Sequence, residues 1–212
     1  MRIGTHYDAL IWDFDGTVMD TYPEIVAAYL DAARSGFGLD VDFEAVWGWA
    51  KNRLGVCRRN IAERAGVTPE EVENEFAVRY EKRDVSSERF FPGAVSVLRA
   101  VILSGGRNFL VTHRSGRSLD EYIAIHDLRR YFVEAVPMLE SFPAKPAPHA
   151  FLYLIAKYRL DPGHCLGVGD RGLDIEAALA AGVDGCFFDP DGAVYSRATY
   201  SIRRLEELLR IL

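Results

Sequence analysis

The sequence predicts an α/β fold, a doubly wound parallel sheet with a second, small all-helical domain. Short apolar runs without polar alternation lie at residues 9–12, 109–111, 166–169 and 185–188. Such runs are typical of strands that are buried on both faces, as in a parallel sheet. Helical patterns lie between and after these runs, and strands that alternate with helices indicate βαβ units.

The helical patterns of this sheet domain are expected near residues 95–102, 151–158, 175–179 and 205–212, where apolar residues recur every three or four positions. Gly105 and Gly106 follow the first pattern, and Gly182 follows the third. Glycine is common just past the end of a helix. Pro148 stands near the start of the second pattern, where proline is tolerated.

The segment from about residue 22 to residue 88 has a different pattern. Ile25, Val26 and Tyr29 begin a helical stripe, and Thr68-Pro69-Glu70-Glu71 has the form of a capping box. No strand-like run occurs in the segment. Asp13 and Thr112 are 112 − 13 = 99 positions apart, which is too long for one crossover helix. We therefore predict a core of residues 1–20 and 89–212 and a helical cap of residues 21–88; a longer ordinary crossover is the alternative.

Composition excludes several classes of protein. The 212 residues are 49% hydrophobic and 26% charged, with a formal net charge of −6, as in an ordinary globular protein. A weakly acidic chain is a poor candidate for binding nucleic acid or an anionic membrane. We expect a cytoplasmic protein, because no signal peptide or membrane-spanning run is visible. One visible site and no long exposed apolar segment are compatible with a monomer or a weak homodimer. The three scattered cysteines indicate neither a disulfide framework nor a zinc site.

Polar side chains stand at the ends of the predicted strands. Asp13, Thr112 and Asp170 each follow an apolar run. Ligands of open parallel sheets bind beyond the carboxyl ends of the strands. If these runs are neighbouring strands, the three residues meet in one crevice although they are far apart in the sequence.

Four carboxylates are expected in this crevice. Gly16 lets the chain turn, so that Asp13 and Asp15 can reach one site, and Asp170 and Asp174 would share one face of a helix start. The carboxylates would repel one another unless a cation neutralised them, and an all-oxygen set favours Mg²⁺. Such an ion commonly binds a substrate phosphate as well. Lys145 and Thr112 would then supply a charge and a hydroxyl donor for that phosphate.

These residues occur in four ordered motifs: Asp13-Phe14-Asp15-Gly16-Thr17, Leu110-Val111-Thr112, Lys145-Pro146, and Gly169-Asp170 with Asp174. In this the chain resembles the haloacid dehalogenase superfamily of phosphohydrolases, over nearly its whole length. The resemblance is to the branch with a helical cap after the first motif, which includes phosphoglycolate phosphatase-like and β-phosphoglucomutase-like proteins. The first motif is specific, whereas the second and third mean little alone.

The resemblance implies a role for each matched residue. Asp13 would be the nucleophile that forms an aspartyl-phosphate, and Asp15 would be the general acid and base. Thr112 and Lys145 would hold the transferring phosphoryl oxygens. Dehalogenase and phosphonatase branches lack a carboxylate at the position of Asp15, so its presence here indicates phosphoester chemistry.

The resemblance also implies a metal site. Mg²⁺ would bind the Asp13 carboxylate, the backbone carbonyl of Asp15, and Asp170. Asp174 would orient Lys145 or a metal-bound water. A position in the first turn of a helix, where a carboxylate is favoured by the helix dipole, is an equally good explanation for Asp174.

The expected activity is that of a Mg²⁺-dependent phosphatase acting on a small phosphorylated metabolite, with no nucleic-acid or membrane partner. One alternative is a phosphomutase that passes the phosphoryl group to a sugar hydroxyl. The other is a regulatory module that binds a phosphorylated ligand without turnover. The intact set of motif residues speaks against this last interpretation.

Several further residues are candidate substrate contacts. Gly16 and Thr17 belong to the first motif. His113 and Arg114 follow Thr112 directly, and His113 departs from the Asn of many relatives. A carboxylate partner is an equally simple explanation for His113.

Cap residues give a weaker signal. Lys51 and Arg53, with Arg58 and Arg59, form a basic run with no acidic residue among them. They could recognise an anionic group, although a solvated helix face is the usual explanation of such a run. Trp47 and Trp49 are interpreted as part of the cap's own core.

Overall fold

The computed structural model describes residues 7–139 and 142–212 and divides the chain into two compact units. One unit consists of Met1–Met19 and Arg89–Leu212, and the other of Asp20–Glu88. We call them the core unit and the cap unit. The boundaries predicted from the sequence lie after residues 20 and 88.

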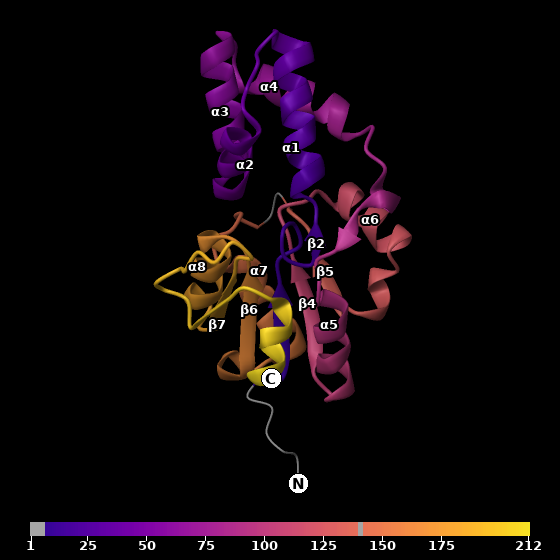
Figure 1. Ribbon diagram of the computed structural model, residues 1–212. Helices are drawn as coiled ribbons and strands as arrows, with labels where there is room; N and C mark the ends of the chain where they lie inside the picture. The colour runs from indigo at the N-terminus through magenta and orange to yellow at the C-terminus, as the bar shows by residue number, and fades with distance from the viewer. Residues whose placement is uncertain (1–6, 140–141) are drawn as a thin grey trace. The chain divides into compact units, whose positions relative to one another are not determined.

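A six-stranded parallel sheet forms the centre of the core unit (Figure 1). In spatial order its strands are β5 (Glu134–Val136), β4 (Arg107–Val111), β1 (Ala9–Trp12), β6 (Cys165–Gly169), β7 (Asp184–Phe188) and β8 (Tyr200–Ile202). Every neighbouring pair is parallel. The four apolar runs are therefore four adjacent strands, and the prediction of a parallel α/β sheet is confirmed. The edge strands β5 and β8 were not predicted, because three residues each are too few for a clear apolar run.

Both faces of the sheet are covered, which explains why the strands lack polar alternation. On one face, Ala9 and Ile11 of β1 pack in a buried cluster with α7 (His149–Tyr158) and α8 (Gly172–Ala180). On the other face, Trp12 donates from Nε1 to Asn108 Oδ1 at 3.0 Å. Asn108 donates in turn from Nδ2 to the carbonyl of Leu98 at 3.0 Å, which ties β4 to α5 (Ala94–Leu103).

Other core elements differ from the sequence pattern. Residues 205–212 were expected to be an α-helix, but the chain forms a 3₁₀ helix, η5 (Leu205–Arg210), beside α5. Helix α6 (Gly116–Ile125) was not predicted, because only Leu119 and Tyr122 of it are buried and its apolar stripe is narrow. The remaining short elements are η3 (Leu128–Arg130), η4 (Pro162–His164) and the two-stranded sheet of β2 (Met19–Asp20) and β3 (Arg89–Phe90).

The cap unit is built from helices around a core of its own. Its elements are α1 (Tyr22–Asp31), η1 (Ala32–Gly36, a π-helix), α2 (Phe43–Asn52), α3 (Leu54–Ala65), α4 (Pro69–Tyr80) and η2 (Val85–Ser87). Tyr29 of α1 stacks on Phe76 of α4 with ring centroids 4.1 Å apart. The predicted capping box begins α4: Glu71 N donates to Thr68 Oγ1 at 3.2 Å, and Thr68 N donates to Glu71 Oε2 at 2.8 Å.

All three cysteines are buried and free. Within the described residues, no helix is both long and apolar enough to cross a bilayer.

Candidate active site

The predicted strand-end residues meet at the carboxyl edge of the sheet. Asp13 follows β1, which lies between β4 and β6, and Thr112 and Asp170 follow those two neighbours. The amide of Asp13 donates to the carbonyl of Val168 at 2.8 Å, so the parallel ladder extends to Asp13. All three side chains are buried. The strand order brings together residues that are up to 157 positions apart, because 170 − 13 = 157.

The first motif forms a tight loop directly after β1. Gly16 has a φ of +77°, which favours glycine, and its amide donates to the carbonyl of Met19 at 2.8 Å. The Thr17 hydroxyl donates to Asp170 Oδ1 at 3.4 Å. Thr17 thus contacts a predicted metal ligand, and its role as a substrate contact stays a prediction, as does that of Gly16.

Lys145 lies at the centre of the acidic group. Its ammonium nitrogen is 2.5 Å from Asp13 Oδ1 and 2.6 Å from Asp174 Oδ1, and it donates to the Val111 carbonyl at 2.9 Å. The Lys145 side chain is only 2% exposed. Burial by itself would lower the pKa of Lys145, but Asp13 and Asp174 outweigh it, so the pKa is raised. Lys145 is therefore a cation at neutral pH.

Asp174 reaches the site from the first turn of α8. Its Oδ2 accepts a hydrogen bond from the Arg171 amide at 3.1 Å, so it also caps the helix. Both interpretations from the sequence, contact with Lys145 and a helix-start role, fit this geometry. A Cβ at Gly169 would lie 2.4 Å from the Cβ of Asp174, so this close approach of α8 to β6 requires glycine at 169.

Arg171, which was not predicted from the sequence, is part of the same cluster. Its Nη2 lies 3.5 Å from Asp13 Oδ2, and its Nε lies 3.9 Å from Asp170 Oδ1 and 3.8 Å from Asp174 Oδ2. Its side chain is 11% exposed. The signal was its place directly after Asp170, at the end of a buried strand.

A second ion pair lies beside this cluster. Arg114 donates to Asp15 Oδ1 from Nε at 2.9 Å and from Nη2 at 2.5 Å. Its amide donates to Thr112 Oγ1 at 3.1 Å. The structure thus places Arg114 against Asp15, a partner that the sequence analysis did not suggest; its role as a substrate contact stays a prediction.

His113 is a mostly buried, neutral imidazole. Burial lowers its pKa, the Lys145 and Arg171 cations lower it further, and the result is a pKa of about 4. Among the described residues, His113 Nε2 is buried without a hydrogen-bond partner. No carboxylate of residues 7–139 or 142–212 pairs with this nitrogen. A role for His113 as a substrate contact stays a prediction.

The carboxylates could hold a small hard cation. Oxygen atoms of Asp13, Asp170 and Asp174 lie within 4.8 Å of one another, and all three residues are buried. Asp13 Oδ2 accepts no hydrogen bond from the described residues. An oxygen-only set of this kind fits Mg²⁺. The third carboxylate of this group, beside those of Asp13 and Asp170, belongs to Asp174. The Asp15 carboxylate is instead paired with Arg114.

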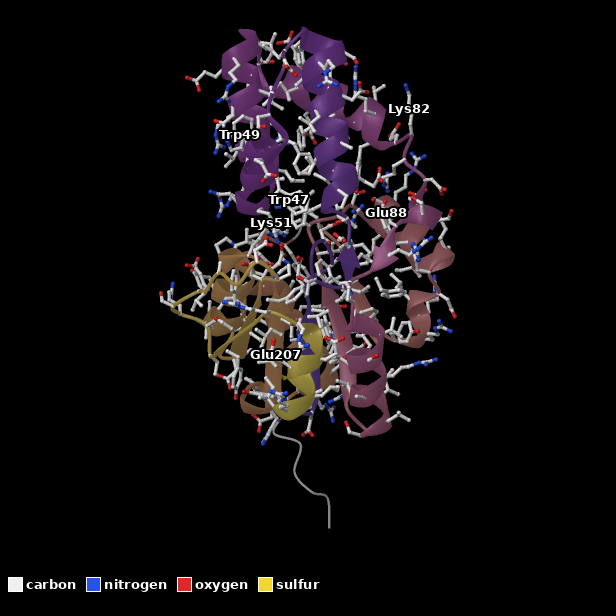
Figure 2. All side chains as sticks on the ribbon, in the orientation of Figure 1. Trp47, Trp49, Lys51, Lys82, Glu88 and Glu207 are labelled. Atoms are coloured by element: carbon white, nitrogen blue, oxygen red, sulfur yellow. The ribbon has the colours of Figure 1, made fainter. Side chains whose placement is uncertain are left out.

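The cap candidates have local partners within the cap unit. Trp47, Trp49 and Lys51 all belong to α2 (Figure 2). The Lys51 ammonium lies 4.8 Å from the centroid of the Tyr22 ring, and Arg53 is exposed at the break between α2 and α3. Both tryptophans pack against the cap core, as the sequence interpretation proposed. Substrate contact by Lys51 and Arg53 stays a prediction.

Comparison with known proteins identifies the family. The model of the haloacid dehalogenase-like hydrolases matches residues 10–188. The chain belongs to this family. The match spans the edge of the sheet at which Asp13, Thr112, Lys145 and Asp170 meet.

Individual relatives give the same result. Phosphoglycolate phosphatase 1 of Pseudomonas aeruginosa is 31% identical over 82% of this chain and 66% of its own length. This chain therefore spans just under two thirds of that relative. A phosphoglycolate phosphatase of Vibrio vulnificus (strain YJ016) is 27% identical over 82% of the chain and 79% of its own length. The crystal structure of a hydrolase from Streptococcus pneumoniae TIGR4 superposes with a TM-score of 0.66 and 29% identity, covering 97% of this chain and 100% of that one.

Proposed function

We propose that this protein is a Mg²⁺-dependent phosphatase that hydrolyses a small phosphomonoester through an aspartyl-phosphate on Asp13. The observation that carries the proposal is the setting of the Asp13 carboxylate. Its Oδ1 is 2.5 Å from the Lys145 ammonium, while its Oδ2 accepts no hydrogen bond from the described residues and faces the Arg171 guanidinium at 3.5 Å. A buried carboxylate oxygen with cations beside it is suited to attack phosphorus, because those cations also attract the phosphoryl oxygens.

The proposed reaction has two halves. First, Asp13 Oδ2 bonds to phosphorus, the bond from phosphorus to the ester oxygen breaks, and Asp15 donates a proton to that oxygen. Second, Asp15 takes a proton from water, the water oxygen bonds to phosphorus, and the bond to Asp13 breaks. Phosphate leaves, and both aspartates return to their starting forms. Lys145, Arg171 and the Thr112 hydroxyl would hold the phosphoryl oxygens in both halves.

Asp13 and Asp170, with the Asp15 carbonyl or the Asp174 carboxylate, would hold Mg²⁺. The bound ion would neutralise charge on the phosphoryl oxygens. Asp174 would in addition keep Lys145 in place through their 2.6 Å contact.

The substrate class is proposed from the relatives together with the site. The matched proteins of P. aeruginosa and V. vulnificus are named phosphoglycolate phosphatases. Phosphoglycolate is therefore the first substrate to test, followed by sugar phosphates and nucleoside monophosphates. The expected partner is a small phosphorylated metabolite rather than nucleic acid or a membrane.

The test is phosphate release from this panel with Mg²⁺ or with EDTA, by wild type, Asp13→Asn, and Asp120→Asn as a control on an exposed carboxylate of α6. We expect release by wild type and Asp120→Asn only with Mg²⁺, and a loss of at least about 10³-fold for Asp13→Asn. Equal release by Asp13→Asn would overturn the proposal. Sugar-phosphate isomerisation with little phosphate release would replace it with a mutase.

A further inference from the structure

The guanidinium of Arg114 is held by contacts within the protein. Two of its N–H groups converge on Asp15 Oδ1, at 2.9 Å and 2.5 Å. The third nitrogen, Nη1, donates to Ser118 Oγ of α6 at 3.0 Å. All three guanidinium nitrogens therefore have partners within the core unit.

Two aromatic rings also pack against the same guanidinium. Its central carbon lies 4.3 Å from the centroid of Tyr122 and 5.3 Å from that of Phe14. The two rings meet edge to face with centroids 5.1 Å apart. The Arg114 side chain is 7% exposed. A cation confined in this way has few other rotamers available, so it fixes the position of whatever it binds.

The residue that Arg114 fixes is the proposed acid and base. Charge-assisted hydrogen bonds from a rigid fork orient a carboxylate more strictly than water or a single donor does. In the second half of the proposed reaction, Asp15 must meet the attacking water as a carboxylate at a defined position. In the first half, the leaving group must instead take a proton from Asp15, which the contact with Arg114 does not assist.

We propose that Arg114 is a positioning residue that holds the Asp15 carboxylate for hydrolysis of the aspartyl-phosphate. This inference rests on the proposed phosphatase function. It assigns Arg114 to the second half of the reaction and not to recognition of the substrate. Segment 112–114 then has two tasks: Thr112 would contact the phosphoryl group, and Arg114 would position Asp15. The two residues are linked, because the Arg114 amide donates to Thr112 Oγ1 at 3.1 Å.

The test follows the phosphoenzyme directly. Wild type, Arg114→Gln and Arg114→Lys are mixed with ³²P-labelled acetyl phosphate or phosphoglycolate and Mg²⁺, quenched at successive times, and assayed for protein-bound and free phosphate. Asp13→Asn reports background labelling. Arg117→Gln is the matched control, because Arg117 is an exposed arginine of the same helix as Ser118.

We expect Arg114→Gln to accumulate phosphoenzyme. Its rate of dephosphorylation should fall by about 10- to 100-fold, within the range of general acid and base effects. The ratio kcat/KM, which reports only the steps up to phosphoenzyme formation, should change less than threefold. Arg114→Lys keeps the charge without the fork and should recover part of the rate. Arg117→Gln should behave as wild type.

Three results would overturn the inference. An unchanged phosphoenzyme fraction in Arg114→Gln would show that Arg114 does not act on hydrolysis. A rise in KM with an unchanged kcat would assign Arg114 to substrate binding instead. A wild type that neither labels Asp13 nor releases phosphate would overturn the proposed function, and this inference with it.

Loss of folding is checked separately. Far-UV circular dichroism and the Tm of each variant are measured first. If Arg114→Gln does not fold, the comparison of Arg114→Lys with wild type decides: the same phosphoenzyme fraction and dephosphorylation rate in both would overturn the inference.

Discussion

An ion pair at the centre of the core unit and one on the surface of the cap unit differ in their exposure to water. In the core unit, Lys145 and Asp13 are 2% and 1% exposed and lie 2.5 Å apart, although 132 positions separate them in the sequence. In the cap unit, Arg58 and Glu73 pair at 3.0 Å with side chains 36% and 42% exposed. The Lys145–Asp13 pair lies where water is excluded, whereas the Arg58–Glu73 pair stays in contact with water. The cap also contains a buried pair, Arg83 and Glu88 at 3.2 Å, so the contrast concerns these two pairs and not every charge of each unit.

The two pairs also differ in what the loss of one partner would cost. A buried ion pair is expensive to assemble, and removal of one partner leaves an uncompensated charge. A solvated pair contributes little in either direction. The buried group of Lys145, Asp13 and Asp174 is therefore a better guide to the functional site than the basic run of the cap.

The largest expected effect comes from Lys145→Met, which would leave the Asp13 and Asp174 carboxylates without their shared ammonium. We expect the free energy of unfolding to fall by about 3–5 kcal/mol, together with loss of phosphatase activity. Urea denaturation in EDTA measures the change. Lys157→Met is the control, because Lys157 pairs with Glu134 at 2.7 Å with its side chain 45% exposed. If both variants lose the same stability, burial does not distinguish the two pairs.

An intermediate effect is expected from His113→Asn, and only at acidic pH. The pKa of His113 is about 4 in the folded protein, below the ordinary value near 6.5. As the pH falls from 6.5 to 4, the unfolded chain takes up a proton at His113 before the folded protein does, so stability falls. The imidazole accounts for at most about 3 kcal/mol of this loss.

Asn does not titrate, so His113→Asn should lose less stability between pH 7 and pH 4.5 than wild type. Urea denaturation at both pH values measures this difference, with the exposed His149→Asn as a control that should follow wild type. Parallel curves for all three proteins would contradict the low pKa of His113.

The smallest effect is expected in the cap unit, from Arg58→Met. This change removes the half-exposed partner of Glu73, and we expect a loss below about 1 kcal/mol. Addition of 0.5 M NaCl should reduce even that difference, because salt screens exposed pairs. A loss as large as that of Lys145→Met would remove the contrast between the two pairs.

Much of the core could be predicted because its signals are local or repeated. Buried strands appear as apolar runs, and the residue at the end of each run is placed at the carboxyl edge of the sheet by the strand itself. The capping box of α4 could also be predicted, since Thr68 and Glu71 are three positions apart and interact within one turn.

Other features depend on partners that are distant in the sequence. Arg171 stands directly after Asp170 in the sequence, but its place in the site depends on three carboxylates that reach it from the ends of β1 and β6 and from α8. Arg114 and Asp15 are 99 positions apart and pair because β4 lies beside β1. The short edge strands β5 and β8 depend on a neighbouring strand for their hydrogen bonds, and three residues carry too little pattern to predict them.

The sequence by itself determined the class of fold, the strand ends that carry Asp13, Thr112 and Asp170, and the ordered motifs of a phosphohydrolase family. Hydrophobic periodicity and short-range spacing encode these features in the chain itself. Only the tertiary structure decided which carboxylate meets which cation: Asp13 and Asp174 share Lys145, and Asp15 pairs with Arg114. Such pairings depend on strand order and on the approach of α6 and α8 to the sheet, which no local pattern encodes.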